Sequence, residues 1–282
     1  MTRAEALREG RARLSAVGVE PAADDARQIL QDVLAVSHAS LIAEPNQALS
    51  SDEQRRFEAS LSRREQREPL SHILGRVDFW SLQLNVNHNV LTPRADTETL
   101  VSCALDALKD RQARVRILDI ATGSGAIALA LLSALPNAEA IATDISPDAL
   151  ALAKENANLC GLSDRVTFIN TDWTKGVSGT FDLVVSNPPY IASDVIRTLD
   201  PEVRDFEPVI ALDGGPDGLE FYPGLLEQTR QRLNANAQAF FEIGYDQGEA
   251  ALALAQHAGF STARIETDLA GRDRVLCVSL TN

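Results

Sequence analysis

The sequence predicts an α/β protein in which a small all-α domain and a β-hairpin linker precede a larger domain with a mostly parallel sheet. Three observations predict this organisation. Residues 1 to about 68 show only helical periodicity, residues 77–91 alternate with period two, and strand-like apolar runs then alternate with helical segments. Such alternation is typical of a parallel sheet covered on both faces. We expect domains at 1–75 and 96–282, joined by a linker at 76–95.

The N-terminal segment predicts at least two helices. Apolar residues at helical spacing predict a helix over Ala22–Val36, with Pro21 at a favourable early position. Ser50 and Glu53 have the spacing of a capping box, which predicts a second helix that continues to Pro69. The segment contains no chemical motif, so we interpret it as a substrate-recognition or packing module.

The alternating residues from Val77 to Leu91 predict a hairpin, and a helix follows at about 96–108. We then expect strands at 115–120, 138–143, 166–170, 181–186, 239–243 and 274–280. Helices are expected at 126–135, 147–159, 219–234 and 247–258. Prolines and glycines interrupt the alternation over 191–218, where a long loop is suited to form a lid or a substrate wall.

The composition is that of an ordinary globular protein. The 282 residues are 45% hydrophobic and 23% charged, with a net charge of −14. This charge argues against a surface that grips nucleic acid, because neutralising phosphates requires Lys and Arg. No apolar run reaches the roughly 18 residues that span a bilayer, and the N-terminus lacks the apolar core of a signal peptide. We expect a cytoplasmic monomer with no membrane partner and no direct nucleic-acid partner.

One predicted helix carries several arginines that are interleaved with glutamates. The spacing allows i,i+4 ion pairs, so we interpret this surface as a solvated, charge-paired face. The arginines are Arg55, Arg56, Arg63, Arg64 and Arg67.

The cysteines and histidines do not predict a metal site. Cys103, Cys160 and Cys277 lie far apart without CxxC spacing, and the four histidines show no ligand spacing. We expect reduced cysteines with a packing role, and no bound metal.

The tetrapeptide Asn187-Pro188-Pro189-Tyr190 follows an apolar strand and is the most informative feature of the chain. Ligands of α/β enzymes bind at this edge of the sheet. Two prolines hold the turn rigid and leave its carbonyl oxygens free, Asn187 adds an amide oxygen, and Tyr190 adds a flat ring. This group of acceptors suits a planar group with an NH2, which is either the exocyclic amine of a nucleobase or the side-chain amide of Gln or Asn.

A second motif joins the first predicted strand of the larger domain to its first helix. The run from Asp119 through Ala121, Thr122, Gly123, Ser124 and Gly125 lets the backbone approach a ligand at a helix N-terminus. Asp144 ends the next strand about 20 residues later, the usual position of a carboxylate that binds ribose hydroxyls.

A pyridine nucleotide is the obvious rival ligand for this loop. The G-x-G-x-x-G fingerprint is not met, because Ala128 stands three residues after Gly125 and Ala121 replaces an earlier glycine. Asp172 and Trp173 follow the third strand and offer a carboxylate and a ring where an adenine would lie. The combination favours S-adenosylmethionine over NAD.

In this order the motifs resemble those of a class I (Rossmann-like) methyltransferase. Flanking segments are similar to the glutamine N5-methyltransferases that modify peptide chain release factors, the HemK or PrmC family. These segments are Pro69–Gly75, Val90–Glu98, Glu207-Pro208 and Gly271–Arg274. The likeness runs from about residue 69 to the C-terminus.

The chain departs from the family pattern at three places. Ala121 replaces a glycine, which we expect to be neutral if this position keeps a negative φ. His72 stands where Tyr is common, and Ala95-Asp96 stands where Pro-Glu is common.

The resemblance implies that the substrate is the glutamine of the Gly-Gly-Gln loop of release factors, and that the N-terminal helices help to dock the release factor. For the chemistry, Asn187 Oδ1 and the Pro188 carbonyl would each accept an N–H of the amide and stabilise its developing positive charge. Tyr190 would position the planar amide, and no strong general base is required. The closest alternatives are a glutamine methyltransferase acting on a ribosomal protein, an adenine-N6 DNA methyltransferase, and a non-catalytic binding protein on the same fold.

Overall fold

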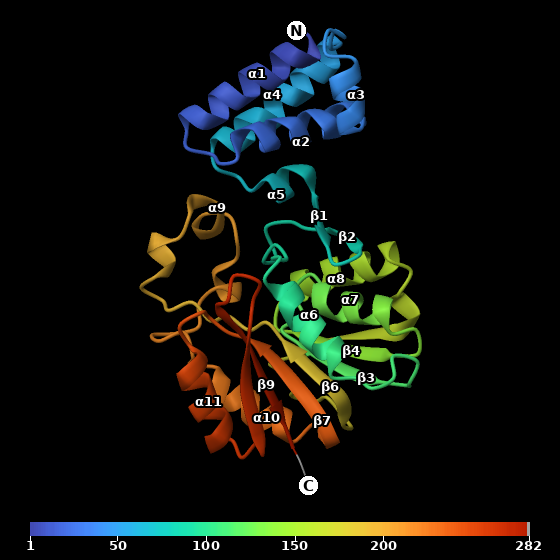
Figure 1. Ribbon diagram of the computed structural model, residues 1–282, viewed down its shortest axis with the longest axis vertical. Helices are drawn as coiled ribbons and strands as arrows, with labels where there is room; N and C mark the ends of the chain where they lie inside the picture. The colour runs from blue at the N-terminus through green and yellow to red at the C-terminus, as the bar shows by residue number, and fades with distance from the viewer. Residues whose placement is uncertain (281–282) are drawn as a thin grey trace. The chain divides into compact units, whose positions relative to one another are not determined.

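The computed structural model describes residues 1–280, and the chain divides into two compact units (Figure 1). Unit 1 consists of Met1–Gly75 and a second segment, Asp200–Phe206. Unit 2 consists of Arg76–Leu199 and the chain from Glu207 onward. The chain therefore leaves unit 2 after Leu199, contributes a short segment to unit 1 and returns to unit 2.

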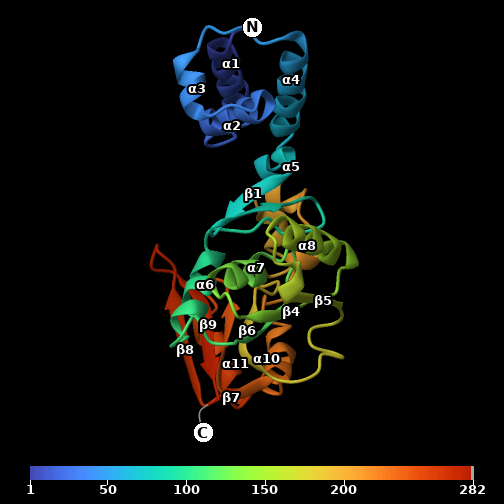
Figure 2. The same cartoon turned by 90° about the vertical axis from the view of Figure 1, so that its right-hand side faces the viewer.

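Unit 1 is helical in both of its segments. Its helices are α1 (Arg3–Ala16), α2 (Ala22–Leu34), α3 (His38–Ala43), α4 (Ser51–Glu65), α5 (Leu70–Leu74) and α9 (Pro201–Arg204). Helices α1, α2 and α4 pack together (Figure 2), and the predicted apolar stripe of α2 is their buried face. Ile29 and Leu30 of α2 meet Phe57 and Leu61 of α4 in this core, and all four are fully buried. At Gly10 of α1 a Cβ would lie 2.9 Å from the Cβ of Ala26, so glycine permits the close approach of α1 and α2.

The start of α4 has the capping box that the sequence predicts. The Ser50 hydroxyl accepts from the Glu53 N–H at 3.3 Å, and the Glu53 carboxylate accepts from the Ser50 N–H at 2.7 Å. Each side chain therefore satisfies a backbone donor that the first turn of a helix leaves without a partner.

The arginines in α4, together with Arg67 just after it, form ion pairs with acidic residues, but not all of them are exposed to solvent. Arg64 is buried and contacts Asp25 at 2.6 Å and Glu202 at 2.9 Å. Arg67 contacts the same Glu202 at 2.7 Å. The expectation of a solvated face was wrong for Arg64, because its partners come from α2 and α9 rather than from its own helix. No i,i+4 pattern along one helix reveals such partners.

Unit 2 begins with the predicted hairpin and continues with the sheet. Strands β1 (Arg76–Phe79) and β2 (Leu82–Asn85) pair antiparallel. Within residues 1–280 the main sheet has seven strands in the order β5-β4-β3-β6-β7-β9-β8. The strands are β3 (Arg116–Ile120), β4 (Glu139–Asp144), β5 (Val166–Asn170), β6 (Phe181–Ser186), β7 (Leu233–Glu242), β8 (Thr262–Thr267) and β9 (Asp273–Ser279). The first five in this order are parallel, and β9 runs antiparallel to both of its neighbours.

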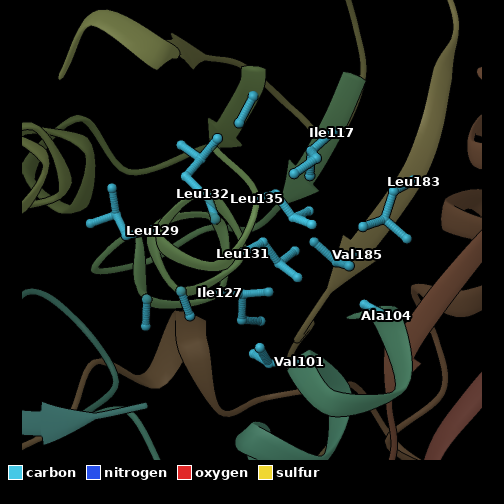
Figure 3. Close-up of a cluster of buried hydrophobic side chains, with 14 of the residues drawn as sticks. Val101, Ala104, Ile117, Ile127, Leu129, Leu131, Leu132, Leu135, Leu183 and Val185 are labelled. Atoms are coloured by element: carbon cyan, nitrogen blue, oxygen red, sulfur yellow. The ribbon is translucent and has the colours of Figure 1, made fainter. Parts of the chain in front are cut away.

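Helices cover both faces of the sheet, as the alternating pattern predicts. They are α6 (Thr97–Asp106), α7 (Ala126–Ala134), α8 (Pro147–Leu159), α10 (Tyr222–Arg230) and α11 (Gly248–His257), with short 3-10 turns at Ser163–Arg165, Ile196–Thr198 and Val209–Ala211. Ile117 and Leu183 pack with α6 and α7 in one apolar layer (Figure 3). Their chain neighbours Leu118 and Val184 pack with α10 and α11 in the other. Because successive strand residues point to opposite faces, the central strands are apolar throughout.

Two parts of unit 2 differ from the sequence prediction. Strand β8 was not predicted, and β7 begins at Leu233 inside the predicted helix 219–234. β8 is an edge strand whose residues are exposed or half-buried, so its apolar signal is weak. No helix within residues 1–280 is long and apolar enough to cross a membrane.

Candidate active site

A cavity of about 650 Å³ lies at the carboxyl ends of the parallel strands of unit 2. Four of these strands deliver a predicted site residue to its wall: Ala121 follows β3, Asp144 ends β4, Asp172 follows β5 and Asn187 follows β6. Parallel strands that end at one edge bring residues distant in sequence together, which is why α/β proteins bind ligands there. The cavity has the size of a small-molecule site.

The loop from Ala121 to Gly125 turns the chain from β3 into α7. Gly123 and Gly125 have φ values of 55° and 85°, in the left-handed region that favours glycine. A Cβ at Gly125 would lie 3.3 Å from the Cβ of Ala153, so this glycine also lets α8 pack against the turn. Thr122, Gly123 and Ser124 line the cavity beside the N-terminus of α7.

Asp119 lies beneath this loop and does not line the cavity. Its Oδ2 accepts a hydrogen bond from the Thr122 hydroxyl at 2.6 Å and from the Ala128 N–H at 3.2 Å. Complete burial raises the pKa of the Asp119 carboxyl to about 7, against the effect of these two donors. Asp119 therefore holds the loop in shape rather than contacting a ligand in the cavity.

Ala121 has a φ of 57°, so the condition under which its replacement of glycine would be neutral is not met. In this region the Cβ of an L-residue approaches the following carbonyl oxygen, at a cost of about 1–2 kcal/mol. The replacement of glycine by alanine is therefore not neutral. The loop conformation is fixed around it, because the neighbouring Thr122 N–H donates to the Thr143 carbonyl at 2.9 Å.

Asp144 ties the end of β4 to the glycine loop. Its Oδ2 accepts from the Gly123 N–H at 2.8 Å, and its Oδ1 accepts from the Ser146 N–H at 2.9 Å. Burial raises the pKa of this carboxyl against the effect of the backbone donors. Each oxygen of an ionised carboxylate has a further lone pair, so Asp144 can still accept from a hydroxyl group in the cavity.

Asp172 and Trp173 line the cavity after β5. The Trp173 ring lies 5.7 Å from the ring of Phe221, with an interplanar angle of 51°. Phe221 also lines the cavity and was not predicted. The two rings form an aromatic wall on which a planar heterocycle could pack.

The Asn187 side chain lines the cavity and is held from one side. Its Nδ2 donates to the Thr97 hydroxyl at 3.3 Å, which leaves Oδ1 as an available acceptor. Pro189 also lines the cavity, whereas Pro188 is buried behind it. The turn is anchored through Ser186, whose hydroxyl donates to the Ile120 carbonyl at 2.7 Å.

Tyr190 does not line the cavity. Its ring packs against the apolar layer of α10 and α11, and its hydroxyl donates to Glu242 Oε1 at 2.9 Å. Its carbonyl accepts from Gln247 Nε2 at 2.9 Å. Burial, followed by the nearby Glu242 carboxylate, raises the pKa of the Tyr190 hydroxyl, which therefore remains a donor.

The segment after Tyr190 folds back and completes the cavity wall. The Gly214 N–H donates to the Ile191 carbonyl at 2.8 Å, and Pro208–Ala211 line the cavity. The neighbouring Glu207 is buried and accepts from Arg94 at 2.7 Å and from the Thr92 N–H at 3.2 Å. Part of the predicted long loop is thus a wall of the cavity.

The structure brings most of the predicted site residues together. Those that line the cavity are Ala121, Thr122, Gly123, Ser124, Asp144, Asp172, Trp173, Asn187 and Pro189. Asp119, Gly125, Pro188 and Tyr190 lie behind the wall. Thr97 and Glu242 were not singled out, although Glu242 ends an apolar strand in the same way as Asp144. Within residues 1–280 no group of three or more His, Cys, Asp or Glu side chains is arranged to hold a metal ion.

Comparison with known proteins places this site in a family. The model of the PrmC N-terminal domain matches residues 5–75, and the model of the methyltransferase small domain matches residues 95–199. The release factor glutamine methyltransferase of Caulobacter vibrioides is 43% identical to the chain, over 98% of this chain and 96% of its own length. That of Moorella thermoacetica is 41% identical, over 97% of each.

Solved structures with lower identity share the fold. The catalytic domain of hMettl16 in complex with the MAT2A 3'UTR hairpin 6 superposes with a TM-score of 0.59 at 18% identity, over 79% of this chain and 82% of that one. The ribosomal protein L11 methylase of Lactobacillus delbrueckii subsp. bulgaricus gives a TM-score of 0.51 at 23% identity, over 67% and 81%. The sheet, the glycine loop and the methyltransferase domain match define an S-adenosylmethionine-dependent methyltransferase of class I. The relatives that match nearly the whole length of the chain define its family more narrowly. The chain belongs to the release factor glutamine methyltransferase family.

Proposed function

We propose that the protein transfers a methyl group from S-adenosylmethionine to the side-chain amide nitrogen (N5) of the glutamine in the Gly-Gly-Gln motif of peptide chain release factors. The observation that carries this proposal is the position of Asn187. Asn187 lines the same cavity as the glycine loop and Asp144, and its Nδ2 donates to Thr97, which leaves Oδ1 available as an acceptor. Relatives named release factor glutamine methyltransferase support the choice of a glutamine over a nucleobase.

The cavity suits the cofactor. The loop at Gly123 presents backbone close to the ligand, Asp144 retains lone pairs for ribose hydroxyls, and Trp173 offers an aromatic face. When bound, S-adenosylmethionine supplies an electrophilic methyl group on a sulfonium. Asp119 supports binding from beneath by holding Thr122.

The chain contributes electrostatic stabilisation and orientation. An amide nitrogen is a poor nucleophile because its lone pair is delocalised into the carbonyl. Asn187 Oδ1 would accept one N–H of the substrate amide and stabilise the positive charge that develops on nitrogen. The Pro188 carbonyl, the second acceptor expected from the sequence, belongs to a residue that does not line the cavity, so Asn187 carries the proposal. Removing one such partner typically lowers the rate by about 10²–10³.

No general base is required at the cavity. The methylated amide is strongly acidic before it loses its proton, so water can accept that proton after transfer. Tyr190 would act by fixing the turn, because its hydroxyl and carbonyl are both held by hydrogen bonds. The rigid Pro-Pro sequence keeps the turn that carries Asn187 in place.

We further propose that unit 1 docks the release factor, since the PrmC N-terminal domain model matches residues 5–75 and the segment carries no chemical motif. All of the proposed site residues come from unit 2 of one chain, so a monomer suffices. The net charge of −14 supports a protein substrate rather than direct binding to nucleic acid. A translation factor as substrate corresponds to a reaction in the cytoplasm.

The decisive experiment locates the transferred methyl group. The purified protein is incubated with methyl-labelled S-adenosylmethionine and a release factor, either wild type or with the Gly-Gly-Gln glutamine changed to alanine, and the digest is analysed by mass spectrometry. We expect label on that glutamine, none on the altered release factor, and a rate about 10²–10³ lower for Asn187→Ala.

Other outcomes overturn defined parts of the proposal. Label on a ribosomal protein or on duplex DNA, and none on the release factor, overturns the substrate. Full activity of Asn187→Ala overturns the role of the Asn187 amide. Binding of S-adenosylmethionine without transfer to any of these substrates overturns the assignment of the reaction.

A further inference from the structure

Glu242 is a buried acidic residue that the proposed mechanism does not use. It ends β7 next to the cavity and is 1% exposed. Its Oε2 is buried and has no well-formed hydrogen bond to any residue in the described part of the chain. Burying a carboxyl without full hydrogen bonding is unfavourable, so an acidic residue at this position requires an explanation beyond packing.

Two hydroxyl groups from different elements face this carboxylate. Tyr190 donates to Oε1 at 2.9 Å, and the hydroxyl of Thr97, at the start of α6, interacts with the same carboxyl group. Burial raises the pKa of the Glu242 carboxyl, and these two hydroxyls and the charge of Arg274 oppose that rise. Glu242 thus contacts Tyr190 of the Asn187–Tyr190 turn directly, and Thr97 lies between Glu242 and Asn187.

The chemistry of these groups fixes the direction of the next hydrogen bond. The Thr97 oxygen accepts from the Asn187 NH2 at 3.3 Å, so the Thr97 hydroxyl hydrogen is directed away from Asn187, and the Glu242 carboxyl is the acceptor that interacts with it. The Thr97 oxygen then has only lone pairs to offer to Asn187. Asn187 must present its NH2 to Thr97, which agrees with the Nδ2–Oγ1 distance of 3.3 Å, and its Oδ1 must face the cavity.

We infer that Glu242 and Thr97 are positioning residues that hold the Asn187 amide with its oxygen toward the substrate nitrogen. The inference rests on the role proposed above for Asn187. If the amide turned over, an NH2 group would face the N–H groups of the substrate, and the acceptor would become a repulsive donor. Glu242 also fixes the Tyr190 hydroxyl, so one carboxylate sets both ends of the turn.

A double-mutant cycle tests the inference through the coupling of two residues. The turnover number kcat at saturating cofactor and release factor is measured for the wild type, Thr97→Val, Asn187→Ala and the double variant. Valine keeps the shape of threonine and removes the hydroxyl. We expect Thr97→Val to lower kcat about 10- to 100-fold, less than the direct loss of an acceptor, and to have no further effect in the Asn187→Ala background.

Cofactor affinity and a conservative variant separate positioning from a structural role. The dissociation constant for S-adenosylmethionine is expected to change less than about twofold in Thr97→Val, since the loss is in orientation and not in binding. Thr97→Ser retains the hydroxyl and is expected to recover kcat to within about threefold of the wild type, because the hydrogen-bond chain is intact.

Glu242→Gln tests the same series of hydrogen bonds from its other end. It replaces Thr97→Val as the test if that variant does not fold. An NH2 group facing Thr97 would turn the hydroxyl hydrogen toward Asn187 and favour the inverted amide. We expect a loss of kcat comparable to that of Thr97→Val, again absent in the Asn187→Ala background. Multiplicative losses in either cycle, or a kcat within twofold of wild type for both single variants, would overturn the inference.

The cycle also distinguishes this inference from the proposed function. If Asn187→Ala alone lowers kcat while the effects of the second variant are independent, the proposed role of Asn187 stands and the positioning role of Glu242 and Thr97 fails. If Asn187→Ala leaves kcat unchanged, the role of Asn187 fails first and the positioning role fails with it.

Discussion

The carboxylate of Asp144 accepts a hydrogen bond from the backbone N–H of Gly123 at 2.8 Å, which ties the end of β4 to the loop after β3. The second oxygen accepts from Ser146 at 2.9 Å, so the side chain is oriented before any ligand binds. A pre-oriented acceptor loses little entropy when a ribose hydroxyl donates to it. Asp144 is therefore expected to contribute to cofactor binding rather than to the rate of transfer.

We predict that Asp144→Ala raises the dissociation constant for S-adenosylmethionine about 10- to 100-fold, as expected for the loss of hydrogen bonds to a charged group. Isothermal titration calorimetry measures this change. Asp148→Ala is the matched control, because Asp148 is an exposed carboxylate on the next helix and does not line the cavity. Equal affinities of the Asp144 and Asp148 variants would contradict the assignment.

Asp119 predicts that stability depends on pH. Burial raises the pKa of its carboxyl to about 7 in the folded protein, above the value of about 3.9 in an unfolded chain. Between these values the folded state binds more protons than the unfolded state, so the contribution of Asp119 to the free energy of unfolding falls as pH rises. The slope is at most about 1.4 kcal/mol per pH unit, and the contribution is complete only below pH 4.

Asp119→Asn provides the measurement, because an amide cannot titrate in this range. Urea unfolding of both proteins at pH 5 and pH 8 gives the difference in the free energy of unfolding at each pH. We expect the free energy of unfolding of the wild type minus that of the variant to be about 2–3 kcal/mol lower at pH 8 than at pH 5. A difference that is the same at both pH values would show that Asp119 does not titrate between them.

Ala121 predicts a stabilising substitution. Its φ of 57° is strained for an L-residue, and glycine adopts this conformation without that strain. We expect Ala121→Gly to raise the free energy of unfolding by about 0.5–1 kcal/mol, since the greater freedom of glycine in the unfolded chain offsets part of the gain. Thermal unfolding detects this change. A lower melting temperature for Ala121→Gly would mean that the Cβ of Ala121 makes packing contacts that outweigh the strain.

Gly218 lies behind the Asn187–Tyr190 turn, which predicts an effect on activity. A Cβ there would lie 2.3 Å from the Tyr190 carbonyl oxygen, whereas a Cβ at Gly176 would meet no atom within 4 Å. Both glycines have positive φ, 75° and 78°, so alanine causes similar backbone strain at each. We expect Gly218→Ala to lower kcat at least tenfold by displacing the turn, and Gly176→Ala to lower stability by about 1–2 kcal/mol with kcat retained. Comparable kcat values for the two variants would show that the turn tolerates the displacement.

The sequence predicts the elements that depend on local pattern and on strand order. The residues after β3, β4, β5 and β6 were placed at one edge because parallel strands end together. The partners of those residues depend on tertiary contacts, and the pattern does not contain them. Thr97 and Glu242 meet the Asn187–Tyr190 turn from α6 and β7, and no spacing in the chain relates the three.

The same distinction explains the errors. The φ of Ala121 is set by the loop as a whole, so residue type alone does not tell whether this position keeps a negative φ. Strand β8 pairs only with β9, at the edge of the sheet, and its exposed residues give little apolar signal. Arg64 is buried by residues from α2 and α9, although its own helix reads as a solvated surface.

Unit 1 is built from two separate segments of the chain, which limits how chimeras can be made between members of the family. Glu202 meets Arg64 and Arg67 inside unit 1, yet it lies in a segment encoded between two stretches of unit 2. A chimera joined at Gly75 alone would combine Arg64 with a foreign segment and leave a buried cation without its second partner. A functional chimera must therefore transfer Asp200–Phe206 together with the N-terminal helices. Residues that contact each other across these two segments are expected to covary among family members.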